Sequence, residues 1–297
     1  MIKRENLRIR DPYVVAHEGT YYMYGTINED KNDKNLYVFC SKNLEDWEEG
    51  KVIFTLAPDF WAETDLWAPE VHLYEEKFYM FISIKGKNGL RGTQILVSNT
   101  PDGRFIPLKN APQTPHDKSC IDGTLYVEDG TPYMVFSSDW PDNFEKDKGC
   151  YVGKISAIEL TKDLKDSVGE AFLLFESDEA PCSKKAPAVH EYLGETVTRY
   201  GSDAPFIQKL SNGNLFLTWS PIPDMNYIVA AAISENGIKG EWKHLDKEIF
   251  DKNGGHAMFF TDFEGNRKMC IHHPERYPDE RALFIDVIEE NGEIKVK

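Results

Sequence analysis

Four carboxylates and one histidine stand at the heads of five similar segments. The segments are RDPYVVAHEGTYYMYGT, APEVHLYEEKFYMFIS, IDGTLYVEDGTPYMVFSS, SDAPFIQKLSNGNLFLTWS and GGHAMFFTDFEGNRKMCIHH, and their heads are Asp11, Glu70, Asp122, Asp203 and His256. Carboxylates whose environments push their pKa values apart can divide the roles of general acid and general base between them. The heads are therefore the first candidates for chemistry, provided that the fold brings them together.

The segments behind the heads predict the elements that would do this. Each head is followed by a short apolar run, a turn and a second apolar run, which contains Tyr22, Tyr79, Tyr133, Leu215 or Met269. This pattern predicts two antiparallel strands joined by a tight turn. The heads lie 59, 52, 81 and 53 residues apart, and all-strand repeats of this size are typical of propeller blades. Equivalent strand ends converge on the axis of a propeller, so we expect the five heads to meet in one pocket.

Further strands complete the predicted blades. A third and a fourth strand can be identified in LYVFCSKNLEDWEEG, TQILVSNTPDGRFIP, VGKISAIELTKDLKDSVG and IVAAAISENGIKGEWKHL. The last segment, RALFIDVIEENGEIKV, is shorter, so we expect N-terminal residues to complete the last blade. An insertion at residues 176–200 is expected to lie beside the pocket, whose shape should depend on residues 85–92, 139–149 and 176–200. The sequence thus predicts an all-β, five-bladed β-propeller in which residues 1–297 form a single domain.

Charge and composition exclude several classes of function. The formal net charge is −16, which argues against nucleic acid or a membrane surface as a partner because both require a basic protein surface. A neutral carbohydrate is compatible with this charge. The five cysteines are scattered, with no C-x-x-C pair, so neither a disulfide framework nor a zinc site is expected.

The N-terminal residues, MIKRENLRIRDPYVV, include no apolar stretch typical of a signal peptide. We therefore expect a cytoplasmic protein, or a secreted or periplasmic one whose signal peptide has been removed. The sequence does not indicate an oligomeric state.

Five short motifs, one in each predicted blade and in the same order, resemble glycoside hydrolase family 43. The motifs are RDPYV, LWAPEVH, IDGTLYV, SDAPFI and GGHAM, and the resemblance covers nearly the whole chain. It implies a five-bladed propeller that hydrolyses arabinofuranosyl, xylosyl or related linkages with inversion. It also implies three catalytic residues. Asp11 would be the base that activates water, Asp203 the general acid, and Asp122 the residue that orients the acid and raises its pKa.

Asp203 departs from the family pattern, which usually has glutamate at this position. Aspartate is shorter by one C–C bond, about 1.5 Å, and a misplacement of about 1 Å can cost on the order of a hundredfold in rate. Three explanations stay open. The pocket is reshaped so that Asp203 reaches the leaving oxygen; another residue, Glu70, Glu179 or Glu195, is the acid; or the protein does not hydrolyse glycosides.

Other residues near the heads are candidates for sugar binding. Trp67, Trp140 and Phe206 could stack on the apolar face of a sugar ring. Glu70, His256 and Arg267 could contact substrate, although each has a plain structural alternative. In the same way, each catalytic aspartate taken alone could be a turn residue, and their shared position in the repeats favours the functional interpretation. No cofactor and no metal ligand set is expected, apart from a possible structural calcium near His256.

These residues together predict an exo-acting, inverting glycoside hydrolase. Its carbohydrate substrate would be a plant-type oligosaccharide, from which it would remove terminal α-L-arabinofuranosyl or β-xylosyl groups. Two alternatives belong to other classes. A phosphate-dependent glycoside phosphorylase would need arginine, lysine and histidine side chains near the axis. A non-catalytic carbohydrate-binding propeller would bind sugars without turnover.

Overall fold

The structure, a computed structural model, describes residues 1–27, 33–223 and 226–297. Within these ranges almost every regular element is a β-strand. The named helical elements are three 3-10 turns: η1 (Arg4–Asn6), η2 (Trp140–Asp142) and η3 (Ser177–Glu179). No described helix has the length and apolar character needed to cross a membrane. The predicted all-β class is confirmed.

The described strands form six sheets. The first comprises β1 (Ile2–Lys3), β2 (Arg10–His17), β3 (Thr20–Thr26), β4 (Asn35–Ser41), β5 (Asp46–Trp47) and β6 (Lys51–Thr55). The second comprises β7 (Ala62–Tyr74), β8 (Lys77–Gly86), β9 (Arg91–Ser98) and β10 (Ile106–Pro107). The third comprises β11 (Cys120–Glu128), β12 (Thr131–Ser138), β15 (Lys154–Leu160) and β16 (Ser167–Glu176).

The fourth sheet comprises β19 (Asp203–Lys209), β20 (Leu215–Ser220), β21 (Ala230–Ser234) and β22 (Trp242–His244). The fifth comprises β23 (Gly255–Thr261), β24 (Arg267–His273), β25 (Arg281–Glu290) and β26 (Glu293–Val296). A smaller sixth sheet comprises β13 (Phe144–Glu145), β14 (Cys150–Val152), β17 (Ala186–Val189) and β18 (Thr196–Tyr200). The first five sheets each contain one of the predicted head segments, in the predicted order.

The predicted hairpins are present in all five of these sheets. Tyr22 pairs with Val15 across β2 and β3, and Tyr133 pairs with Tyr126 across β11 and β12. The tight turn at Asp129 and Gly130 places two successive residues at positive φ, 49° and 78°. Two such residues match the right-handed twist of the strands that they join, and Asp-Gly is a favoured pair for this turn.

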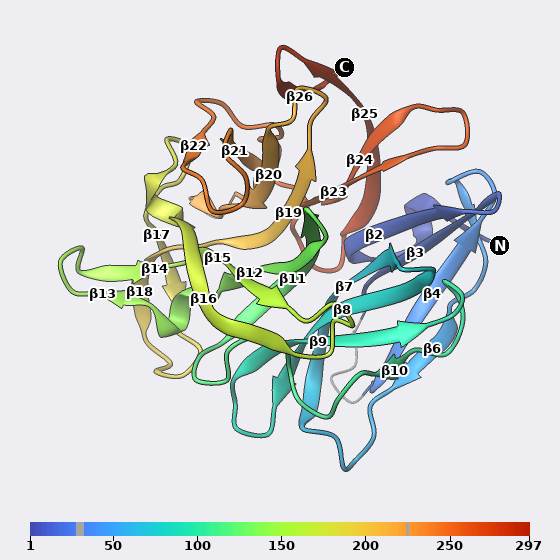
Figure 1. The fold of residues 1–297 in the computed structure, drawn as a ribbon, viewed down its shortest axis with the longest axis horizontal. Coiled ribbons are helices and arrows are strands. Elements are labelled where there is room, and N and C mark those ends of the chain that lie inside the picture. Colours follow the sequence, from blue (N-terminus) through green and yellow to red (C-terminus); the bar gives the residue numbers. More distant parts are fainter. Residues whose placement is uncertain (28–32, 224–225) are drawn as a thin grey trace.

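The first strands of the five sheets contact one another in order. β2 contacts β7, β7 contacts β11, β11 contacts β19, β19 contacts β23, and β23 contacts β2. Figure 1 shows these strands near the middle of the molecule, with the later strands of each sheet farther out. Side chains buried between the sheets, such as Tyr24, Phe81 and Trp219, stabilise this arrangement by removing large apolar surfaces from water. One end of each first strand is thereby fixed near the common centre.

The N-terminal segment and the last sheet are joined differently from the prediction that N-terminal residues complete this sheet. The last sheet is completed by its own strand, β26, whereas N-terminal strand β1 pairs with β5 of the first sheet. The N-terminal segment still bridges the two sheets, because the Ile9 N–H donates to the Glu280 carbonyl oxygen at 3.2 Å and the Arg281 side chain donates to the Glu5 carbonyl oxygen at 2.7 Å. N-terminal residues thus add one antiparallel bridge to the last sheet, between Arg8 and Arg281 of β25, but the fourth strand of that sheet is β26 and not the N-terminal strand that we expected.

The insertion at residues 176–200 forms half of the sixth sheet. Its strands β17 and β18 join β13 and β14, with β18 running parallel to β14. This small sheet projects at the left of Figure 1. Val189 and Glu191 of the insertion line the cavity described below, so its predicted position beside the pocket is confirmed.

Candidate active site

The same β-bulge occurs in the first strand of all five sheets. In each, two residues of the first strand stand opposite one residue of the second, and the pairs are 11 and 12, 68 and 69, 122 and 123, 204 and 205, and 256 and 257. The first residue of each pair has a positive φ, between 45° and 58°. Such a bulge re-aims side chains at the end of a strand. Each bulge therefore turns the end of its strand towards the place where the five first strands meet.

The bulges define which residues of the five repeats are structurally equivalent. Asp11, Asp122 and His256 occupy the first bulge position, as predicted from their shared place in the repeats. In the second and fourth sheets this position holds Ala68 and Ala204. Asp203 thus lies one residue before the bulge, and Glu70 directly after it. The repeat in the sequence identified the five segments correctly. Two of the predicted heads, Glu70 and Asp203, do not occupy the bulge position of their strands.

Side chains of neighbouring sheets hold the bulges in place. Four of the five bulge N–H groups donate to a residue of the preceding sheet's second strand: Asp11 to His272 Nδ1, Ala68 to Thr26 Oγ1, Asp122 to Ser83 Oγ and His256 to Ser220 Oγ, at 2.7 to 3.1 Å. The fifth, Ala204, donates to Asp122 Oδ2 at 3.0 Å. Because buried N–H groups require partners, these bonds fix the heads relative to one another. Asp122 also fixes the backbone beside Asp203.

A cavity of about 520 Å³ opens over the bulges. Its lining residues are Arg8, Arg10, Asp11, Thr26, Trp67, Arg91, Ile121, Asp122, Asp139, Trp140, Pro141, Val189, Glu191, Asp203, Tyr227 and His256. The predicted catalytic residues Asp11, Asp122 and Asp203 therefore share one cavity. The three segments predicted to shape the pocket all contribute to it, through Arg91, through Asp139 to Pro141, and through Val189 and Glu191.

Asp11 is held in its ionised form. Thr26 Oγ1 donates to Asp11 Oδ2 at 2.7 Å, and His256 Nδ1 lies 3.1 Å from Oδ1. Burial alone would raise the pKa of Asp11. The charge of His256, its hydrogen bond and the charge of Arg10 together bring that pKa well below its ordinary value. A buried carboxylate that stays ionised can accept a proton from water.

His272 completes the orientation of Asp11. Its Nε2 lies 2.5 Å from Glu275 Oε2, and its Nδ1 accepts the Asp11 N–H at 3.1 Å. These two contacts assign the ring proton to Nε2, because the carboxylate can only accept a hydrogen bond. The geometry therefore gives His272 the role of positioning Asp11.

Asp203 has the opposite electrostatic environment. Burial raises its pKa well above the ordinary value, and the charges of Asp122 and Asp139 raise it further, while Arg199 and His256 oppose the shift. Burial also raises the pKa of Asp122, against the charge of His256. A carboxyl group kept protonated in this way can donate a proton. Asp11 and Asp203 are thus shifted in opposite directions within one cavity.

Two predicted sugar-binding aromatic residues line this cavity, and charged neighbours fix both of them. The guanidinium of Arg91 lies 4.1 Å from the ring centroid of Trp67, and that of Arg199 lies 5.4 Å from the ring of Trp140. Arginine over an indole face is a favourable cation–π geometry. His190 also packs edge-on against Trp140. Both rings are thereby immobilised at the rim, where a sugar could stack on them.

Three other predicted binding residues lie outside the cavity lining. Phe206 is buried in the core against Tyr13 and Phe259. Arg267 bonds to Gln208 and pairs with Glu289 Oε2 at 3.4 Å, at the junction of the fourth and fifth sheets. Glu70 is buried beside the cavity and lies 3.1 Å from His72 Nε2.

The alternative general acids suggested by the sequence are also placed by the structure. Neither Glu70, Glu179 nor Glu195 lines the cavity. Glu179 caps η3 with its side chain, and Glu195 is exposed. The one glutamate in the lining, Glu191, is bonded to Arg91 and Lys85; although burial opposes the shift, these cations lower its pKa to about 2. It is therefore ionised at neutral pH and has no proton to donate.

Several lining residues were not identified as site residues from the sequence. Arg10 is part of the RDPYV motif, and Asp139 precedes Trp140, so both had a local signal in their neighbours. Arg91 and Glu191 lie in segments predicted to shape the pocket, but no motif marks either residue. They are 100 residues apart and meet only in the fold, where Arg91 Nη1 lies 2.6 Å from Glu191 Oε2.

The chemistry around His256 does not fit a calcium ion bound by protein side chains. His256 Nδ1 pairs with Asp11, and its Nε2 is buried without a hydrogen-bond partner. Calcium prefers six to eight oxygen ligands, whereas no cluster of three or more His, Cys, Asp or Glu residues suited to a metal occurs among the described residues. Burial lowers the pKa of His256, but Asp11, Asp122 and Glu70 raise it to about 9. Because the described residues offer no such ligand cluster, we derive no step through a metal.

This raised pKa predicts a pH dependence of stability. An unfolded histidine has a pKa of about 6.5. The stabilisation from protonated His256 is therefore complete below pH 6.5 and is lost as the pH rises through about 9. We expect the free energy of unfolding of the wild type to fall by about 3 kcal/mol more than that of His256→Gln across this range. Denaturant unfolding at several pH values measures the difference. The exposed His116→Gln variant should behave as wild type, and parallel curves for wild type and His256→Gln would contradict the assignment.

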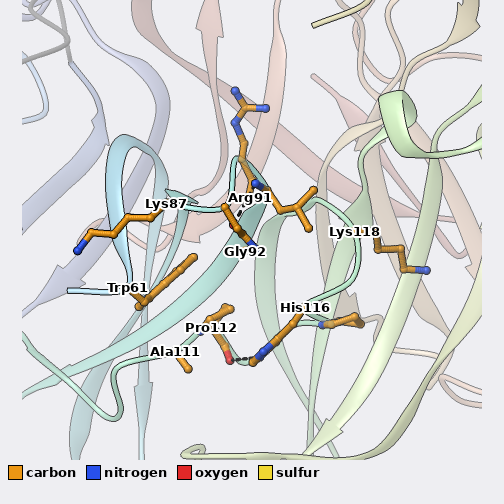
Figure 2. A pocket seen from close by; sticks show the side chains of 11 residues that line it. Trp61, Lys87, Arg91, Gly92, Ala111, Pro112, His116 and Lys118 are labelled. Atoms are coloured by element: carbon orange, nitrogen blue, oxygen red, sulfur yellow. Dashed lines mark hydrogen bonds between the residues drawn. The ribbon is translucent and has the colours of Figure 1, made fainter. Parts of the chain in front are cut away.

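A second hollow, of about 310 Å³, lies on the second sheet (Figure 2). Its lining includes Trp61, Lys87, Pro112, His116 and Lys118, and it shares Arg91 with the cavity. Figure 2 shows the Arg91 side chain extending away from the other lining residues. The lining contains no carboxylate. This hollow therefore lacks the carboxylates that the cavity over the bulges provides.

Comparison with known proteins agrees with this fold and site. The chain belongs to glycosyl hydrolases family 43, whose sequence pattern matches residues 6–292. Its fold is accordingly the β-propeller of that family.

Among solved structures, the chain is similar to an endo-arabinase from Bacteroides thetaiotaomicron VPI-5482, with 33% identity, a TM-score of 0.87 and 99% of each chain covered. It is also similar to a thermostable family-43 glycoside hydrolase, with 26% identity, a TM-score of 0.80 and coverage of 97% of this chain and 92% of that one. A curated relative, alpha-L-arabinofuranosidase 43 from Humicola insolens, is 22% identical over 92% of this chain and 56% of its own length. The chain spans about half the length of the curated relatives that it matches.

Proposed function

We propose that residues 1–297 form one five-bladed propeller that acts as an exo-acting, inverting glycoside hydrolase. Its substrates are oligosaccharides with terminal α-L-arabinofuranosyl or β-xylosyl groups, and it requires no cofactor. The observation that carries the proposal is the opposite pKa shift of Asp11 and Asp203, which face the same cavity. A cytoplasmic location, or export with removal of a signal peptide, stays a prediction.

Each of the three aspartates has a defined part in the proposed reaction. Asp203 donates its proton to the glycosidic oxygen as the bond from that oxygen to the anomeric carbon breaks. Asp11 accepts a proton from water as the water oxygen attacks that carbon from the opposite face, which inverts its configuration. Asp122 fixes the backbone after Asp203 through the Ala204 N–H. Its buried carboxylate also raises the pKa of Asp203.

The insertion supports exo action. Glu191 bonds to Arg91 and Lys85 of the second sheet, and Arg91 also pairs with Asp65 at 2.9 Å. These bonds tether residues 176–200 across one side of the cavity. A wall in this position favours the end of a sugar chain over its interior.

Endo action is the second candidate, and two observations favour it. The similar Bacteroides thetaiotaomicron structure is an endo-arabinase. In addition, a further hollow of about 490 Å³ adjoins the cavity and shares Trp67, Arg91 and Glu191 with it. A longer sugar chain could extend into that space.

Product analysis distinguishes the two modes. Arabino- and xylo-oligosaccharides of defined length would be digested and their products followed by chromatography, with NMR of the anomeric proton of the first product formed. We expect a single monosaccharide from the outset, released with inverted configuration. Early release of a range of shorter oligosaccharides would overturn exo action, and retained configuration would overturn the inverting mechanism.

The arginines of the cavity give the phosphorylase alternative no support. Its three arginines are already paired: Arg8 with Glu280, Arg10 with Glu275, and Arg91 with Glu191 and Asp65. Phosphate binding requires cations that are available to the anion. We therefore expect the rate to be independent of added phosphate. The non-catalytic alternative is decided by the same digest, because it predicts no products at all.

A further inference from the structure

Glu275 is a carboxylate that lies behind the cavity and takes no direct part in the proposed reaction. It belongs to the segment between β24 and β25, and it is not among the residues that line the cavity. Its N–H donates to the Asn253 carbonyl oxygen at 2.8 Å, and the Asn253 side chain accepts the Tyr227 N–H at 3.2 Å. The backbone of Glu275 is thus tied to Tyr227, which does line the cavity.

The two oxygens of the Glu275 carboxylate bind two different donors. Oε1 accepts a hydrogen bond from Arg10 Nη1 at 2.9 Å, and Oε2 lies 2.5 Å from His272 Nε2. Arg10 directly precedes Asp11 in β2, and His272 Nδ1 accepts the Asp11 N–H at 3.1 Å. These four residues therefore form a closed ring, in which the peptide bond before Asp11 is one link.

The ring orients His272 more completely than its packing alone does. His272 is fully buried, and the Tyr227 ring stacks on it with a centroid distance of 5.3 Å and an interplanar angle of 13°. Stacking fixes the plane of the imidazole, but it does not determine which ring nitrogen carries a hydrogen. The carboxylate of Glu275 determines this, because it can only accept a hydrogen bond and so leaves Nδ1 as the acceptor for Asp11.

The ring holds Asp11 at the bulge that aims it into the cavity. Thr26 and His256 contact the Asp11 side chain, whereas the ring fixes its backbone, whose buried N–H requires an acceptor. We propose that Glu275 is a positioning residue for the proposed base: its carboxylate binds His272 and Arg10 at once, and through them it fixes the place of Asp11 in the cavity. The inference rests on the proposed function, in which Asp11 activates water.

The test is Glu275→Gln, which keeps the shape of the side chain. Its amide has one acceptor oxygen and one donor nitrogen, so it can serve His272 or Arg10 but not both. We expect kcat/KM on arabino- or xylo-oligosaccharides to fall by about 10–100-fold, since a misplacement of about 1 Å can cost on the order of a hundredfold. The loss should appear in kcat rather than in KM, because Glu275 does not line the cavity. Asp279→Asn removes a partly exposed carboxylate that binds Arg276 in the same segment, and it should keep full activity.

A double-mutant cycle separates this role from a purely structural one. Azide is a nucleophile that needs no base, so azide-dependent turnover by Asp11→Asn does not use the group that Glu275 positions. Adding Glu275→Gln to Asp11→Asn should therefore leave the azide-dependent rate nearly unchanged. An equal loss in the two backgrounds would overturn the proposal. So would a raised KM with an unchanged kcat, which would assign Glu275 to sugar binding through Arg10.

NMR of ¹⁵N-histidine-labelled protein gives a readout that needs no turnover. In the wild type we expect His272 to carry its hydrogen on Nε2, with His272→Gln identifying the resonances. Glu275→Ala removes both bonds of the carboxylate and should change these resonances, whereas Asp279→Asn should not. Hydrogen on Nδ1 in the wild type, or unchanged resonances in Glu275→Ala, would overturn the proposal. If the wild type hydrolyses no glycoside, the proposed function fails on its own; the resonances still decide whether Glu275 holds His272.

Discussion

Replacement of Asp11 by asparagine is expected to lower kcat/KM by about 10²–10⁴-fold, the usual loss when a positioned acid or base is removed. Asparagine has the shape of aspartate but cannot accept the proton of the attacking water. The effect should be similar for activated aryl glycosides and for natural oligosaccharides, because water attacks in both. Steady-state kinetics on the two substrate types would measure it.

A small anionic nucleophile provides a sharper version of this test. Azide needs no base to attack the anomeric carbon, so it should restore turnover in Asp11→Asn and give a glycosyl azide of inverted configuration. Asp166→Asn, which removes a surface carboxylate paired with Lys109, controls for loss of one negative charge and should keep full activity. Unfolding curves must accompany the kinetics, since Thr26 and His256 both bond to Asp11. An Asp11→Asn protein that is folded and fully active would exclude Asp11 as the base.

The repeat pattern was sufficient to predict the hairpins and the shared cavity, because strand periodicity and turn residues are local features. Alignment within the repeat was harder. Ala68 and Ala204 occupy the bulge positions of their strands, and alanine has no polar group that a search for candidate chemistry would select. The nearby carboxylates Glu70 and Asp203 were therefore taken as the heads. Successive residues of a strand point to opposite faces of the sheet, so a shift of one residue changes the direction of a side chain. The shift leaves Asp203 in the cavity and places Glu70 outside its lining.

The rest of the site depends on pairings that no local pattern encodes. Arg91, Asp65 and Glu191 are far apart in the sequence. The Arg91–Asp65 pair forms when β7 and β9 join the second sheet, and the Arg91–Glu191 pair forms only when the insertion folds back over that sheet. The opposite pKa shifts of Asp11 and Asp203 also depend on residues that only the fold brings together. His256 and Arg10 surround Asp11, whereas Asp122 and Asp139 lie near Asp203. Three aspartates that look alike in the sequence acquire different proton affinities from these neighbours.

Replacement of Asp203 by asparagine should have an equally large effect, but one that depends on the leaving group. For an unactivated oligosaccharide we expect kcat/KM to fall by about 10²–10⁴-fold, because the departing oxygen then leaves without a proton. An aryl glycoside with an acidic phenol needs little protonation and should lose far less. The readout is kcat/KM across a series of aryl glycosides of graded phenol pKa. It should be nearly flat for the wild type and should fall steeply with phenol pKa for Asp203→Asn.

The pH dependence of kcat/KM is an independent test of Asp203 as the general acid. The pKa of Asp203 is raised, so the protonated, active form persists well above pH 4 and is lost only as the pH rises through that raised value. The wild type should therefore have an alkaline limb that Asp203→Asn lacks. Asp203→Glu keeps the acid and lengthens its reach by about 1.5 Å, which tests whether the cavity is shaped for the shorter side chain. Lower activity of Asp203→Glu on oligosaccharides would show that it is. An equal loss on all aryl glycosides in Asp203→Asn would instead contradict a proton-donating role, because a general acid matters least where the leaving group needs it least.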